Sequence, residues 1–128
     1  MAITEKKFLK SLRDHIPRAH WQRIESWQVA PGVPDLNGCQ DGKEVWIEAK
    51  IVKGKQVNLT PLQVNWLEKR ARHGGSVYIV ALYRDRLIAV WGGEFARKVA
   101  DEGIDAPGGL LFEMDLHGWS QLESAIFA

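Results

Sequence analysis

Apolar positions recur along the chain at two spacings, one typical of helices and the other of strands. Residues 4–16 carry their apolar side chains on one helical face, Thr4 can cap the start, and Pro17 follows the end. A second helix is predicted to begin at Thr60-Pro61, because proline suits the first helical position, and to end at His73-Gly74-Gly75.

Alternation of apolar and polar residues predicts short strands between and after these helices. The predicted strands cover residues 20–28, 33–38, 44–52, 76–83, 86–91 and 110–116. Two further helices are predicted over residues 94–103 and 119–128. The resulting order of the first elements, αβββαβ, indicates one α/β domain over residues 1–128. Its core is expected over about residues 3–91, with a C-terminal extension, 92–128, to which the sequence assigns no function.

The strand predicted at residues 44–52 divides its side chains between two faces. One face is expected to pack in the core and carries Val45, Ile47, Ala49 and Ile51. The other face carries Trp46, Glu48, Lys50 and Val52, so that a carboxylate lies beside an ammonium. Turn signals at Asn37-Gly38 and Asp41-Gly42 predict that the preceding strand folds back antiparallel. Such a hairpin would bring Asp35 across from Glu48.

These residue types suit metal-dependent hydrolysis of a phosphodiester. Mg²⁺ prefers oxygen ligands in octahedral geometry, and Asp35, Glu48 and the backbone carbonyl of Ala49 would supply three of them. The metal would polarise the phosphate and lower the pKa of a bound water. Lys50 would orient that water or stabilise charge on the phosphoryl oxygens. We therefore expect a Mg²⁺ site in which Mn²⁺ can substitute.

Pro34-Asp35 and Glu48-Ala49-Lys50 resemble the signature of the PD-(D/E)XK nuclease superfamily. The similarity spans roughly residues 3–91, and its wider residues look like the VRR-NUC and phage-type branch, which includes small Holliday-junction resolvase-like enzymes. Those wider residues are Arg23-Ile24-Glu25, Gly32-Val33, Trp46-Ile47, Gln63 and Trp66. The resemblance implies a mixed central sheet flanked by helices, an endonuclease that cuts branched DNA, and a homodimer.

Three further residues are implied by the resemblance, each with a simpler structural alternative. Glu5 stands where resolvase relatives carry a metal-site glutamate, and its spacing to Phe8 places it on the buried stripe; the alternative is that it complements the helix dipole. Glu25 competes for the same role, or pairs with Arg23. Gln63 either contacts the phosphate or water beside Lys50, or closes a capping box with Thr60; the two roles are expected to need different rotamers.

Positive charge is concentrated in the part of the chain that carries these motifs. Residues 1–73 hold 13 Lys and Arg against 8 Asp and Glu, whereas residues 74–128 hold 4 against 8. Lys and Arg supply the sequence-independent part of affinity for nucleic acids. The predicted DNA contacts are Lys53 and Lys55 after the active strand, Lys6 and Lys10 on the first helix, and Arg70 on the second.

We expect a cytoplasmic protein, in a bacterium or a phage-infected cell as the resemblance implies, and not a secreted one. The single cysteine, Cys39, has no partner for an internal disulfide, and neither a signal-peptide core nor an apolar run of membrane-spanning length is present in the sequence. Two alternatives to a resolvase-like enzyme stay open: a restriction- or repair-type nuclease acting on flaps or single strands, and an inactive nuclease-fold module that only binds DNA.

Overall fold

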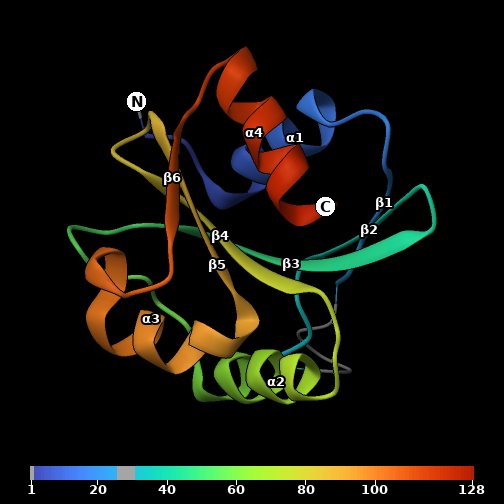
Figure 1. Ribbon diagram of the computed structural model, residues 1–128. Helices are drawn as coiled ribbons and strands as arrows, with labels where there is room; N and C mark the ends of the chain where they lie inside the picture. Colours follow the sequence, from blue (N-terminus) through green and yellow to red (C-terminus); the bar gives the residue numbers. More distant parts are fainter. Residues whose placement is uncertain (1, 26–30) are drawn as a thin grey trace.

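A mixed sheet with helices on both faces forms the fold (Figure 1). The structure is a computed structural model that describes residues 2–25 and 31–128. Within them the strands are β1 (His20–Arg23), β2 (Leu36–Gln40), β3 (Lys43–Ile51), β4 (Val77–Tyr83), β5 (Leu87–Gly92) and β6 (Leu110–Glu113). The helices are α1 (Glu5–His15), α2 (Pro61–Arg72), α3 (Ala96–Glu102) and α4 (Leu116–Ile126), with short 3₁₀ turns at Gly93–Phe95 and Gly103–Asp105.

The strands lie side by side in sequence order, from β1 to β6. Only β3 and β4 pair in parallel among the described strands, and every other neighbouring pair is antiparallel. A parallel pair needs a crossover connection. Helix α2 makes that crossover and therefore lies across one face of β3. The predicted α/β class, mixed sheet and flanking helices are confirmed.

The predicted β2–β3 hairpin is confirmed, with Leu36 opposite Ile47. Of its two turn signals, only Asp41-Gly42 forms the turn, and both residues have the positive φ that tight hairpin turns require. The other, Asn37-Gly38, lies inside β2 and was wrongly assigned to a turn. Gly38 is needed there for a different reason: a Cβ at this position would lie 2.3 Å from the ring of Trp21.

Two separate apolar layers hold the sheet between the helices. Helices α1 and α4 cover one face and α2 and α3 the other, as Figure 1 shows. The first layer includes Phe8, Leu12, Ile47, Val80, Trp119, Leu122 and Ile126. The second includes Val52, Val64, Leu67, Ile79, Trp91 and Val99. Both faces of the central strands are therefore buried, and the segment 92–128, expected to be an extension, contributes to both layers.

Several predicted boundaries differ from the structure. The strand expected over residues 20–28 ends at Arg23, and its part over residues 26–28 lies outside the described residues. The helix expected over 119–128 begins at Leu116, because the Asp115 side chain accepts a hydrogen bond from the Gly118 amide and caps it. In the portion of the chain that the structure covers, no helix is long and apolar enough to cross a membrane.

Leu122→Ala should destabilise the protein by about 2–5 kcal/mol, because it leaves a cavity in the first layer, where Leu122 is 0% exposed. Leu116→Ala on the same helix is the matched control, since Leu116 is 81% exposed, and it should change stability by about 0.5 kcal/mol or less. Urea unfolding of both variants measures the difference. Equal small effects would mean that α4 is not part of the cooperative core.

Candidate active site

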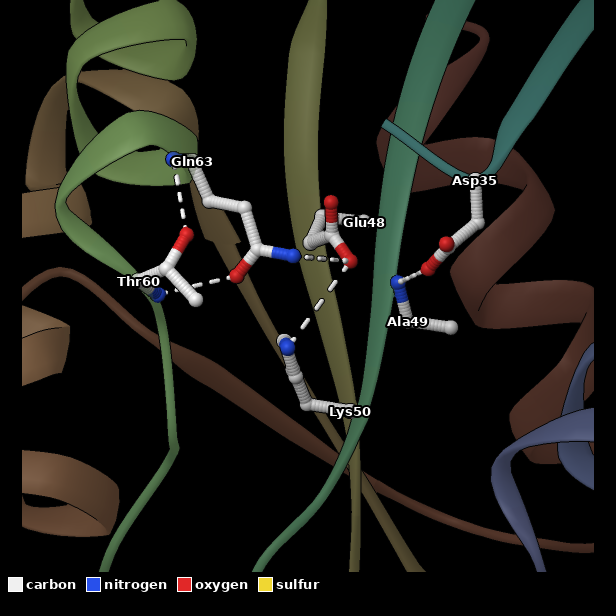
Figure 2. Close-up of polar contacts among 6 residues, drawn as sticks. All are labelled: Asp35, Glu48, Ala49, Lys50, Thr60 and Gln63. Carbon is white, nitrogen blue, oxygen red and sulfur yellow. Dashed lines mark hydrogen bonds and ion pairs between the residues drawn. The ribbon is translucent and has the colours of Figure 1, made fainter. Parts of the chain in front are cut away.

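Glu48 and Lys50 lie on the face of β3 that α2 covers (Figure 2). Both residues are nearly inaccessible, with 1% of Glu48 and 9% of Lys50 exposed. The Lys50 Nζ lies 4.0 Å from the Glu48 Oε2. Alternation along the strand thus predicted which face carries the charges, but this face is buried beneath a helix, where electrostatic interactions are stronger than in water.

Asp35 joins this pair from the start of the neighbouring strand. Since Leu36 pairs with Ile47, Asp35 comes to lie beside Glu48, as the hairpin predicted. Its Oδ2 accepts a hydrogen bond from the Ala49 amide at 3.2 Å, and its own carbonyl accepts one from the Ile24 amide at 2.8 Å. The Ala49 amide therefore holds the Asp35 carboxylate against β3 (Figure 2), while the Ile24 amide fixes the backbone of Asp35.

Gln63 makes the capping box of α2 and reaches the site at the same time. Its side-chain Oε1 accepts a hydrogen bond from the Thr60 backbone amide at 2.9 Å, while its own backbone amide donates to the Thr60 hydroxyl at 3.2 Å. Its Nε2 donates to Glu48 Oε2 at 3.5 Å (Figure 2). The capping role is therefore confirmed, and contact with a phosphate or water stays a prediction. In the rotamer that closes the capping box, the two ends of the side-chain amide reach Thr60 and Glu48 together.

The Glu48 carboxyl is strongly disfavoured as a bare anion. Burial is the largest cause of a raised Glu48 pKa, and the adjacent Asp35 carboxyl adds to it. The Lys50 ammonium opposes both, and the net result is a pKa of about 10. Its Oε1 is buried and has no hydrogen-bond partner within residues 2–25 and 31–128. An unpaired buried oxygen is costly, so the site favours a cation that this oxygen can bind.

The donor set fits a hard divalent cation. Asp35 and Glu48 present carboxylate oxygens from adjacent strands, and Mg²⁺ usually needs only one or two carboxylates because it keeps several waters. Among the described residues, no group of three or more His, Cys, Asp and Glu is arranged to hold a metal. The Ala49 carbonyl therefore stays a predicted ligand. Neither Glu5 nor Glu25 forms a three-carboxylate group with Asp35 and Glu48.

Those two glutamates line different hollows of the surface. Glu5 is exposed at the start of α1, so its placement on the buried stripe was wrong; the stripe begins only at Phe8. Its charge is nevertheless near enough to raise the pKa of Glu48 slightly, and it lines a hollow of about 510 Å³ with Lys53. Glu25 is also exposed and lines a pocket of about 520 Å³ together with Asp35 and Gln63.

The predicted DNA contacts are all exposed, but they differ in what surrounds them. Lys10 pairs with Asp14 at 2.6 Å and Lys55 with Asp105 at 3.7 Å, which are surface ion pairs of small energy. Lys6 and Lys53 have no ion pair among the described residues. Arg70 instead lies over the ring of Trp66, 4.5 Å from its centroid. Trp66 was expected as one of the wider residues of the resemblance, and this contact was not predicted, although the spacing of four residues on a helix indicates it.

Comparison with known proteins identifies a fold but no sequence family. No family model matches the chain, and no curated protein matches it. Among solved structures it is similar to Hjc, a Holliday junction resolvase from the archaeal hyperthermophile Archaeoglobus fulgidus. The two share 20% sequence identity, with a TM-score of 0.52, over 71% of this chain and 74% of that one. The α/β fold inferred from the motifs is therefore the fold that the structure and this comparison show.

The raised pKa of Glu48 predicts a specific pH dependence of stability in EDTA. Because the folded-state pKa lies above the usual value of 4.5, the protonated carboxyl stabilises the fold at low pH, and this contribution is lost as pH rises from about 4.5 toward 10. Glu48→Gln has no ionisable carboxyl at this position, so it should not lose this stability as pH rises. The difference in unfolding free energy between Glu48→Gln and the natural protein should grow with pH, by at most about 1.4 kcal/mol per unit.

Urea unfolding at pH 5.5 and 8.5 measures this change, and Glu44→Gln, at an exposed position of the same strand, is the control. Parallel pH profiles for all three proteins would show that Glu48 ionises normally. Added Mg²⁺ should stabilise the natural protein more at pH 8.5 than at pH 5.5, because the ion competes with the proton for the same carboxyl.

Proposed function

We propose that this protein is a Mg²⁺-dependent DNA endonuclease, selective for branched structures, in which Mn²⁺ can replace Mg²⁺. The observation that carries the proposal is the buried Glu48 carboxyl beside Lys50 and the half-buried Asp35, with one Glu48 oxygen that has no hydrogen-bond partner among the described residues. A buried carboxylate that faces a second one destabilises a fold unless a cation or a proton neutralises the pair. A module that only bound DNA would gain nothing from placing these charges near phosphates, so the arrangement favours hydrolysis.

Each residue has a separate part in this reaction. Asp35 and Glu48 would hold the ion, with the Ala49 carbonyl as a further ligand. When bound, the ion supplies a Lewis acid for the scissile phosphate and lowers the pKa of a water. The Lys50 ammonium, a compact point charge, stabilises charge that develops on the phosphoryl oxygens. Gln63 is a positioning residue, since its amide orients the Glu48 carboxylate from the first turn of α2.

The preference for branched DNA rests on two weaker supports. One is the likeness of fold to Hjc, a Holliday junction resolvase. The other is the excess of Lys and Arg in residues 1–73, which would bind phosphates of more than one DNA arm. Symmetric cleavage of a four-way junction needs two active sites, and this domain provides one, so we propose that it acts as a homodimer. Glu5 and Glu25 remain the two candidates for completing the metal site.

Asp35→Asn and Glu48→Gln should each abolish cleavage while DNA affinity is kept or increased, because each removes a metal ligand and a negative charge that repels phosphate. Glu44→Gln, an exposed carboxylate on the same strand, should cleave normally. Cleavage is followed on labelled DNA with Mg²⁺, and binding is followed in EDTA. Full activity in a folded Asp35→Asn or Glu48→Gln variant would remove the metal-site assignment.

Four-way junctions should be cut faster than linear duplex of the same sequence, and the protein should sediment as a dimer, because the two active sites must act on one branched molecule. A panel of duplex, flap, single-stranded and four-way-junction DNA, with and without Mg²⁺, measures the preference. If the protein is a monomer and cuts flaps or single strands best, it is a restriction- or repair-type nuclease and not a resolvase-like one. No cleavage of any substrate with Mg²⁺ or Mn²⁺ would support the DNA-binding module.

A further inference from the structure

A basic and aromatic stripe runs along α2, next to the site that Gln63 enters. A pocket of about 340 Å³ is lined by Trp66, Lys69, Arg70 and His73, so its lining side chains are three basic groups and one indole. No carboxylate of the described residues lines it. Such a combination of positive charge and ring surface suits a ligand that is both anionic and flat, which is the chemistry of a nucleotide.

Arg70 is held in place before any ligand arrives. Its guanidinium carbon lies 4.5 Å from the ring centroid of Trp66 and 5.8 Å from that of Trp46, and the two indoles pack edge to face with centroids 5.5 Å apart. Gly75 leaves room for the Arg70 stem, because a Cβ at this position would lie 2.6 Å from the Arg70 Cγ. The planar group is thus pre-organised on an aromatic support, which lowers the entropy cost of stacking.

The positive charge of this stripe is not neutralised by the protein. Glu68, the acidic residue of α2, pairs with Arg97 of α3 at 3.4 Å. In the part of the chain that the structure describes, Lys69, Arg70 and His73 make no ion pair with a carboxylate. Cations in the last turn of a helix also complement its dipole. That effect alone does not explain why the Arg70 guanidinium lies over two indoles.

The stripe is continuous with the candidate active site. Trp46 lies on the same face of β3 as Glu48, two residues or about 7 Å away. On α2, Leu62 lines the pocket that holds Asp35 and Gln63, and His73 lies about 16 Å further along the helix. At about 3.4 Å per stacked nucleotide, this length accommodates roughly five nucleotides of one strand.

We propose that the α2 stripe binds an unpaired segment of the DNA strand that adjoins the scissile phosphate. A base stacks on the Arg70 guanidinium and the Trp66 edge, while backbone phosphates contact Lys69 and His73. Only an unpaired base presents its face in this way, because bases within a duplex are stacked on their neighbours. The inference rests on the proposed nuclease function and specifies its substrate: DNA with unpaired nucleotides beside the cut, as at a branch point.

The test compares binding to a labelled thymidine oligomer of about 12 nucleotides with binding to a duplex of equal length, in EDTA. Arg70→Gln and Arg70→Lys should each lower affinity for the oligomer by about tenfold and affinity for the duplex by about twofold or less. Arg70→Lys is decisive because it keeps the charge and loses the planar group. Arg72→Gln is the matched control, since Arg72 is exposed in the same helical turn and does not line the pocket.

Normal oligomer affinity in Arg70→Lys, or equal losses in Arg70→Gln and Arg72→Gln, would overturn the inference and leave only non-specific attraction to phosphate. Cleavage assays with Mg²⁺ separate this outcome from failure of the proposed function. If DNA is cut but the Arg70 variants bind the oligomer normally, the inference alone fails. If the oligomer binds through Arg70 and no DNA is cut, the nuclease proposal fails and the stripe stands as a single-strand binding site.

Discussion

The Asp35 carboxylate meets the buried Glu48 carboxylate only because the β2–β3 hairpin has one particular register. With Leu36 opposite Ile47, Asp35 lies beside Glu48, and the Ala49 amide holds it there. A slip of one residue would turn the whole side-chain set of the strand to the other face. The apolar residues of both strands prevent that slip, because Leu36, Val45 and Ile47 must all face the layer beneath α1 and α4. Core packing therefore specifies the geometry of the site.

The parallel pairing of β3 with β4 has a second consequence for the site. Its crossover brings α2 over Glu48 and Lys50, which buries them and raises the pKa of the Glu48 carboxyl. The same helix begins with the Thr60–Gln63 capping box, so the residue that orients Glu48 is also fixed by the helix start. Local helix stability and orientation of the buried carboxylate thus depend on one side chain.

Further along α2, the helix changes its role from positioning the site to offering a surface. Its buried side contributes Val64 and Leu67 to the second apolar layer. Its outer side carries Trp66 and Arg70, supported from β3 by Trp46. Glu48 and Lys50 on β3 and the stripe on α2 therefore lie on neighbouring elements that pack together on the same face of the sheet.

The sequence by itself determined the fold class, the β2–β3 hairpin, both faces of β3 and the capping box at Thr60, because each depends on contacts between residues close in the chain. Only the tertiary structure decided that the face with Glu48 is buried, that Glu5 lies exposed, that Gln63 serves two partners, and that residues 92–128 complete both layers. These properties depend on which helix the crossover places against which strand, and local periodicity carries no information about such long-range packing.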